Sequence, residues 1–264
     1  MKVPPTSTPI PSIDEFKSLG TLLPYHTYLA YYDLLVALQS LNKDSTKERP
    51  VHLDLYCGTG MSSQVLADDY TRLGSSAIVV GVDRSFDRLS RGGMFKGSIK
   101  DPSDASIAAN CNVRTISNNC IMVRADVPSL MSMYLNSRRP GLTPFPNVVK
   151  TTIFYPNPYP KSRSYNSRFY GEPWFLGYRL EAGGEVEVRS NWETLCMQAL
   201  DVWKMGGMGV EGVEGVLRRV EEGGDGGVEG GGGVEVVEEG ERRVSLFERK
   251  YFDVGERCFK VTLT

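Results

Sequence analysis

The chain contains only two histidines, and its five cysteines lie far apart in the sequence. No pair of cysteines has the spacing of zinc ligands, so we expect no metal site. An odd, scattered set of cysteines also disfavours structural disulfides and is typical of reduced thiols. Because His26 and His52 both precede every motif described below, a histidine general base is disfavoured too.

Long apolar runs are missing as well. No stretch of about 18 apolar residues occurs, and the start, MKVPPTSTPIPS, lacks the apolar core of a secretory signal. We therefore expect a soluble, intracellular protein, with the nucleus or cytoplasm favoured over an organelle. At 264 residues the chain is long enough for one substantial domain.

Glycine is concentrated in residues 206–243, which hold 14 of the 28 glycines together with ten acidic residues and four arginines. Ordering glycine costs more backbone entropy than ordering any other residue, so we expect a flexible insert without chemistry. Since the whole chain has a net charge of −2, the remainder has a net charge of +4. A mildly basic body permits a nucleic-acid partner without requiring one.

Elsewhere, short apolar runs alternate with helix-like stretches. The runs are VHLDLYC (51–57), AIVVGVD (77–83), CIMVRADV (120–127) and VVKTTIFYP (148–156). This alternation predicts an α/β fold with a parallel sheet covered on both faces. Near the end, SLFERKYF and RCFKVTLT flank DVGE and predict a closing antiparallel hairpin. We expect residues 1–50 to form a helical cap on a domain spanning 51–264.

Two of the apolar runs end in signals for a nucleotide-like ligand. In LDLYCGTG (53–60), Asp54 closes the first run, and Gly58 and Gly60 follow where a helix should begin. Glycines at such a turn let a ligand approach the backbone, and the helix N-terminus offers free N–H groups. Asp83 ends the second run, where a carboxylate can accept ribose hydroxyls. A nicotinamide cofactor is the rival, but the third glycine of G-x-G-x-x-G is missing.

The third run ends at Asp126, on the edge where open α/β sheets bind ligands. Acidic residues at three successive strand ends suit S-adenosylmethionine, whose amino group, ribose and adenine all donate hydrogen bonds. Asp126 also has an alternative role, because it could cap the helix that begins near Pro128.

The loop FYPNPYPKSR (154–163) resembles the signature F-x-D-P-W-P-K-x-R-H of the tRNA (guanine-N7) methyltransferase family. Its order Pro-aromatic-Pro-Lys is specific, and it differs from the N-P-P-Y loop of amino-group methyltransferases. Two later stretches, 180–195 and 245–261, resemble the family's L-K-P-G-G-x-x-x-x-x-T-D-W-E segment and its T-x-F-E segment with the final hairpin. The likeness runs from about residue 51 to the C-terminus, excluding the glycine-rich insert. The matching loop positions are Phe154, Pro158, Pro160, Lys161 and Arg163.

The resemblance implies a Rossmann-like class I methyltransferase with a mostly parallel seven-stranded sheet and a C-terminal antiparallel hairpin. It implies S-adenosyl-L-methionine as cofactor and tRNA as substrate, and a WD-repeat accessory subunit becomes a candidate partner, because some eukaryotic members work with one. The cofactor contacts implied are Asp54, Gly58, Gly60, Asp83 and Asp126, with Asn157 at the catalytic carboxylate position. The substrate contacts implied are Lys161, Arg163, Asn191, Ser245 and Glu248.

Asn157 and Asn191 stand where the family has aspartate. Guanine N7 already carries a lone pair, so methyl transfer needs no base and depends mainly on alignment of the reactants. A neutral amide stabilises the developing positive charge less than a carboxylate does, so we expect reduced activity unless another carboxylate, such as Glu248, compensates. Two alternatives stay open: a non-catalytic relative that binds S-adenosylmethionine or RNA, and a methyltransferase for another RNA or small-molecule nitrogen.

Basic and aromatic residues interleave after the proline-rich loop. Lys161, Arg163 and Arg168 alternate with Tyr159 and Tyr165. This mixture combines charge for phosphate binding with surfaces for base stacking. We therefore expect the loop to hold the Asn157 carboxamide and the basic groups beside the cofactor.

Overall fold

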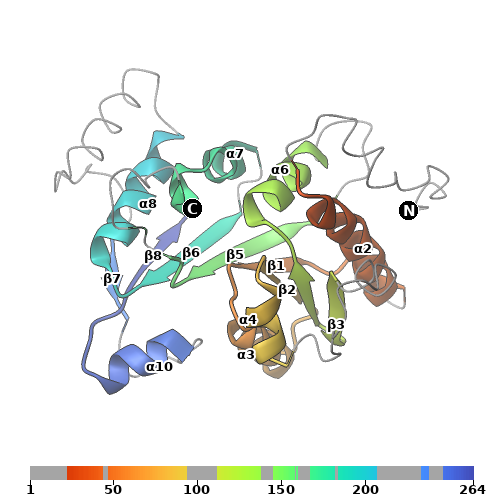
Figure 1. The fold of residues 1–264 in the computed structure, drawn as a ribbon, viewed down its shortest axis with the longest axis horizontal. Coiled ribbons are helices and arrows are strands. Elements are labelled where there is room, and N and C mark those ends of the chain that lie inside the picture. The colour runs from red at the N-terminus through yellow and green to blue at the C-terminus, as the bar shows by residue number, and fades with distance from the viewer. Residues whose placement is uncertain are drawn as a thin grey trace.

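The computed structural model describes residues 23–43, 47–93, 112–137, 145–157, 159, 167–181, 184–206, 233–237 and 246–264. Within these ranges the chain forms one eight-stranded sheet in the order β3-β4-β2-β1-β5-β6-β8-β7 (Figure 1). The strands are β1 (Val51–Leu55), β2 (Ile78–Asp83), β3 (Val113–Ser117), β4 (Cys120–Arg124), β5 (Val148–Phe154), β6 (Glu185–Ser190), β7 (Glu235–Val236) and β8 (Phe259–Leu263).

The centre of the sheet is parallel, as the sequence predicts. Strand β1 pairs in parallel with β2 and β5, β2 pairs with β4, and β5 pairs with β6. Antiparallel pairs lie toward the edges, where β3 joins β4 and where β8 lies between β6 and β7. The predicted mostly parallel, Rossmann-like α/β class is confirmed.

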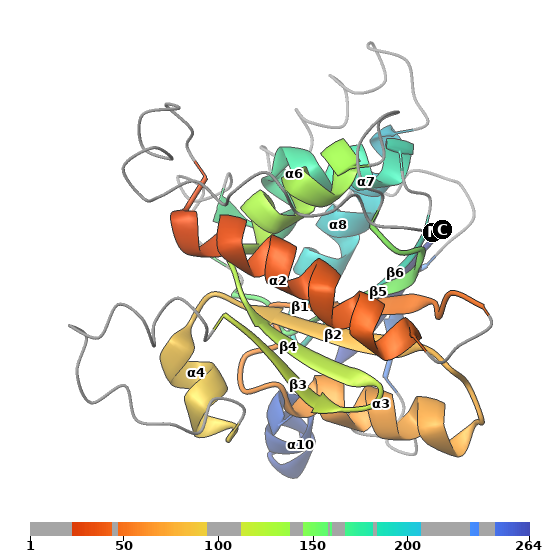
Figure 2. The same cartoon turned by 90° about the vertical axis from the view of Figure 1, so that its right-hand side faces the viewer.

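Helices cover both faces of the sheet (Figure 2). One layer holds α2 (Tyr25–Asn42), α6 (Val127–Ser137), α7 (Pro173–Glu181) and α8 (Glu193–Met205). The other holds α3 (Met61–Arg72), α4 (Phe86–Arg91) and α10 (Leu246–Asp253), and a short 3₁₀ turn, η2 (Phe169–Gly171), precedes α7. Strands β1 and β2 are buried along their whole length, as expected for parallel strands covered on both sides. None of the helices described is long and apolar enough to cross a membrane.

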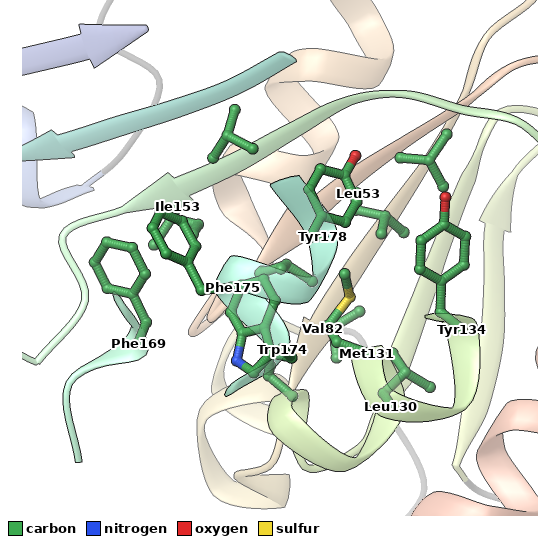
Figure 3. Packing of buried hydrophobic residues seen from close by; sticks show 14 of the residues in the cluster. Leu53, Val82, Leu130, Met131, Tyr134, Ile153, Phe169, Trp174, Phe175 and Tyr178 are labelled. Carbon is green, nitrogen blue, oxygen red and sulfur yellow. The ribbon is translucent and has the colours of Figure 1, made fainter. Parts of the chain in front are cut away.

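The larger part of the core lies between the sheet and the layer of α2, α6, α7 and α8. Phe175 is fully buried, and its ring centroid lies 5.3 Å from those of both Phe169 and Trp203. Figure 3 shows the side chains that fill this space from strands and helices alike. They include Leu53, Val82, Leu130, Met131, Tyr134, Ile153, Trp174 and Tyr178. This packing fixes the strands whose carboxyl ends carry the site.

The predicted C-terminal hairpin is only partly correct. Strand β8 is antiparallel to its neighbours, but the expected partner, SLFERKYF, is wrong: residues 246–253 form α10. The actual partner of β8 is β7, which lies inside the glycine-rich segment. Part of that segment therefore belongs to the sheet, and Val237 beside it is 2% exposed. Most of the remaining segment lies outside the described residues. Strand β3 is an eighth strand that the sequence did not predict.

Candidate active site

The turn between β1 and α3 lies half-buried at the carboxyl edge of the sheet. Tyr56, Gly58 and Gly60 all have a positive φ, of 60°, 61° and 77°. Gly60 is the residue before the first turn of α3, which leaves the helix N–H groups directed at the turn. A Cβ atom at Gly58 would meet nothing within 4 Å. The turn therefore combines open space with helix N–H groups, which suits the approach of a polar ligand.

Asp54 lies under this turn rather than on its surface. The residue is completely buried, and its Oδ2 accepts hydrogen bonds of 2.6 Å from the hydroxyls of Ser62 and Ser63. Its Oδ1 accepts another from Thr152 at 3.1 Å. Burial, the largest influence, raises the pKa of Asp54 to about 6, although these three hydroxyls lower it. In the described structure, Asp54 joins β1, β5 and the start of α3.

The raised pKa of Asp54 predicts a dependence of stability on pH. The pKa of Asp54 is near 3.8 in the unfolded chain and about 6 in the folded protein. Between these pH values the Asp54 carboxyl is protonated in the folded protein and ionised in the unfolded chain. The free energy of unfolding should therefore fall by roughly 3 kcal/mol relative to Asp54→Asn as the pH rises through this window. Urea unfolding of both proteins from pH 4 to 7 measures the difference, in which the contributions of other groups such as His52 cancel. A difference that is constant with pH would contradict this prediction.

Asp83 ends β2 and is 1% exposed. Its Oδ2 accepts a hydrogen bond of 3.0 Å from the backbone N–H of Gly58. Its Oδ1 accepts bonds of 2.7 Å from the Ser85 N–H and 2.9 Å from Arg88 Nη2. The structure thus brings together the glycine turn and the second acidic strand end, and contact of either with a cofactor stays a prediction.

Asp126 follows β4 and caps α6. Its Oδ2 accepts hydrogen bonds from the backbone N–H of Ser129 at 3.2 Å and from the Ser129 hydroxyl at 2.7 Å. Its own N–H donates to the hydroxyl of Thr27 in α2. The capping alternative is therefore present in the structure. The carboxylate stays partly exposed at the edge of the sheet, so contact with a cofactor remains a prediction.

Asn157 is exposed and follows β5. Its side-chain Oδ1 accepts a hydrogen bond of 3.3 Å from the N–H of Tyr159. Lys161 and Arg163 lie outside the described residues. Arg168 is 6% exposed and donates to the Tyr159 carbonyl and to Gln198, so its predicted phosphate-binding role does not fit this position. Arg168 instead links Tyr159 to Gln198 in α8.

The remaining predicted substrate contacts differ in how far they are exposed. Asn191 is exposed and donates a hydrogen bond of 3.3 Å to Glu256. Glu248 is fully buried in α10, and its Oε1 lies 2.9 Å from Arg189 Nη1. The strand predicted for SLFERKYF, which contains Glu248, is wrong, because that segment is helical. The pairing of Glu248 with Arg189 also makes it a poor source of free negative charge. Ser245 lies outside the described residues.

Sequence reasoning missed a carboxylate near the site. Glu172, between η2 and α7, has a raised pKa because it is partly buried and because the charge of Asp126 acts on it. Burial, and then the charges of Glu172 and Asp126, raise the pKa of Tyr56 in the glycine turn. The charge of Tyr159 also raises the pKa of Tyr56. Glu172 therefore lies in the same electrostatic neighbourhood as the glycine turn and the loop that follows β5. No motif in the sequence marks this position.

Among the residues described, no group of three or more His, Cys, Asp or Glu side chains could hold a metal ion. No protein-family profile matches the chain, and no curated protein is significantly similar to it in sequence.

Similarity to solved structures is at the level of shape. The antibiotic-resistance methyltransferase Kmr is 15% identical, with a TM-score of 0.38 over 86% of this chain and 91% of that one. Human methyltransferase 10 domain containing protein is 8% identical, with a TM-score of 0.40 over 93% and 86% of the two chains. Magnesium protoporphyrin IX methyltransferase from Synechocystis PCC 6803, solved with bound SAM, is 10% identical, with a TM-score of 0.32 over 90% and 81%. Sequence identities and TM-scores this low do not indicate which cofactor or substrate this chain binds.

Proposed function

We propose that the chain is an S-adenosylmethionine-dependent methyltransferase that forms N7-methylguanosine in tRNA. The observation that carries the cofactor assignment is the meeting of an open glycine turn with Asp83 at one sheet edge, joined by the 3.0 Å hydrogen bond from Gly58 N–H. A nucleotide-like ligand needs both a backbone that it can approach and a carboxylate for its ribose. The tRNA assignment rests on the resemblance of the loop at 154–163 to the guanine-N7 family.

The residues at this edge fit S-adenosylmethionine. The missing Cβ of Gly58 leaves space beside the N-terminus of α3, where the amino-acid part of the cofactor can approach N–H groups. In this proposal Asp83 accepts hydrogen bonds from the ribose, and Asp126 accepts one from a donor on the adenine. Asp54 acts indirectly in this proposal, because its hydrogen bonds to Ser62 and Ser63 hold the start of α3.

When bound, S-adenosylmethionine supplies an electrophilic methyl group. The chain's own contribution is orientation, which provides roughly 7–11 kcal/mol of barrier lowering in well-aligned reactions. Asn157 is exposed three residues after the end of β5, and its Oδ1 accepts a long hydrogen bond of 3.3 Å from the Tyr159 N–H. In this proposal the carboxamide gives up that bond to accept one from a guanine N–H. Positive charge develops on the purine during transfer, and Glu172 is the carboxylate that we assign to stabilise it. Glu248 is unsuited to this role because Arg189 neutralises it.

Replacing Glu172 with glutamine is expected to lower kcat by about 10- to 100-fold, below the loss seen for fully buried stabilising groups because Glu172 is partly exposed. Binding of S-adenosylhomocysteine should stay unchanged. Glu185→Gln is the matched control, since Glu185 begins β6 at the opposite edge and pairs with Lys150. Single-turnover kinetics measures the rate of methyl transfer, and calorimetry measures the binding of S-adenosylhomocysteine. Equal kcat values for Glu172→Gln and Glu185→Gln would contradict the proposed role of Glu172 in stabilising the purine.

A labelled-methyl assay tests the proposed reaction directly. Unmodified tRNA is incubated with the protein and labelled S-adenosylmethionine, and the digested nucleosides are separated. Labelled 7-methylguanosine is the expected product. Binding of both ligands without any product would instead support a non-catalytic binding protein, which the neutral Asn157 favours. A different labelled nucleoside would reassign the substrate atom.

A further inference from the structure

The Asp83 carboxylate is already bound by three donors from its own chain. Oδ1 accepts from the Ser85 N–H and from Arg88 Nη2, and Oδ2 accepts from the Gly58 N–H. A carboxylate offers about four acceptor sites in total. With the three donors found among the described residues in place, about one acceptor site remains, whereas a ribose diol brings two hydroxyl donors to this position. One of the three present donors must therefore leave when a ribose binds.

Arg88 is the donor that can leave. The Gly58 and Ser85 N–H groups belong to the backbone of the two turns that flank Asp83. Arg88 reaches Asp83 through a long side chain that is 46% exposed. An ion pair with one half-exposed partner is weak and screened by salt, so little affinity is lost when it opens.

Helix α4 is packed closely against the glycine turn. Gly92, directly after the helix, packs against the glycine turn so closely that a Cβ there would lie 1.8 Å from the Thr59 carbonyl oxygen. The helix start is also fixed, because the Ser85 hydroxyl accepts a hydrogen bond of 3.3 Å from the Arg88 N–H. The half-exposed Arg88 side chain is therefore the group at this position that can move with the least change in packing.

We propose that Arg88 is an affinity-determining residue that holds the Asp83 carboxylate until the ribose hydroxyls of an adenosyl ligand displace it. This inference rests on the proposed function. Displacement of the guanidinium makes binding weaker than the Asp83 carboxylate alone would allow. It also makes binding sensitive to salt, because ions that screen the pair help to free Asp83.

Calorimetric titration with S-adenosylhomocysteine at about 50 mM and 300 mM salt tests this proposal on the wild type, Arg88→Ala and Arg91→Ala. Arg91 is the matched control, since it is exposed on the same helix and bonds to the Asp87 carbonyl. At low salt, Arg88→Ala should bind about three- to fivefold more tightly than the other two proteins. The advantage should shrink at high salt.

Equal or weaker binding by Arg88→Ala would overturn the proposal, and weaker binding would show that Arg88 contacts the ligand. The absence of S-adenosylhomocysteine binding in all three proteins would overturn the proposed function, and this inference with it. Tighter binding by both Arg88→Ala and Arg91→Ala would indicate a general effect of charge on α4 and would also contradict the specific role of Arg88.

Discussion

Replacing Arg189 with methionine is expected to lower the free energy of unfolding by about 3–5 kcal/mol. The guanidinium lies between two carboxylates, with Nη1 2.9 Å from Glu248 and Nε 2.7 Å from Glu187. It also lies 5.2 Å from the centre of the Phe154 ring. Because Glu248 is fully buried, the substitution leaves its carboxylate without the guanidinium charge in a medium that solvates ions poorly. Chemical denaturation measures the loss.

Two further variants isolate the ion pair as the cause. The double variant Arg189→Met with Glu248→Leu should recover most of the lost stability, because apolar side chains replace buried ion pairs well. Glu248→Gln should cost less than Arg189→Met, since Arg189 keeps Glu187 as a partner. A loss below about 1 kcal/mol for Arg189→Met would show that the pair contributes no more than a surface salt bridge.

Asn157→Asp is expected to raise the rate of guanosine methylation by up to about 10²-fold. One stabilising group in an active site is worth about 10²–10³ in kcat, and the restored carboxylate would face the cationic purine as it forms. We expect a gain no larger than the lower end of this range, because Glu172 already supplies negative charge in the proposed site. The change is nearly isosteric, and Asn157 is exposed, so the fold should be unaffected.

Asn191→Asp is the matched control for Asn157→Asp. Asn191 also stands where the family has aspartate, but its amide donates to Glu256, so a new carboxylate there would meet a like charge. We expect no increase in rate for this variant. Steady-state kinetics on tRNA compares the two. Loss of existing activity in Asn157→Asp, or a rise in both variants, would refute the assignment of Asn157.

The parallel strands were predictable because each is a short, continuous apolar run bounded by a turn signal. Strands β1 and β2 begin and end within two residues of the runs at 51–57 and 77–83. Helix α10 was not predictable, since a short segment such as LFERKYFD fits the period of a helix or a strand about equally well. Strand β3 carries mostly half-exposed or exposed residues, so no buried pattern marks it.

The carboxylates of the site were visible in the sequence, but their partners were not. Asp54 and Asp83 stand at strand ends beside a glycine turn, which is a local signal. Thr152 reaches Asp54 from 98 positions away through the pairing of β1 with β5. Arg88 and Glu172 have no motif around them, and only the packing of α4 and α7 brings them to the sheet edge. Tertiary contact therefore decides which carboxylate remains available to a ligand.

Calorimetric titration of the wild-type protein with S-adenosylhomocysteine and, separately, with NAD tests the central claim most directly. The glycine turn and Asp83 could contact the adenosine part of either ligand. Comparing the two titrations therefore shows which of the two nucleotide-like cofactors the protein binds. We predict saturable binding of S-adenosylhomocysteine at one site per chain and no heat with NAD. Tight binding of NAD with no response to S-adenosylhomocysteine would contradict the account.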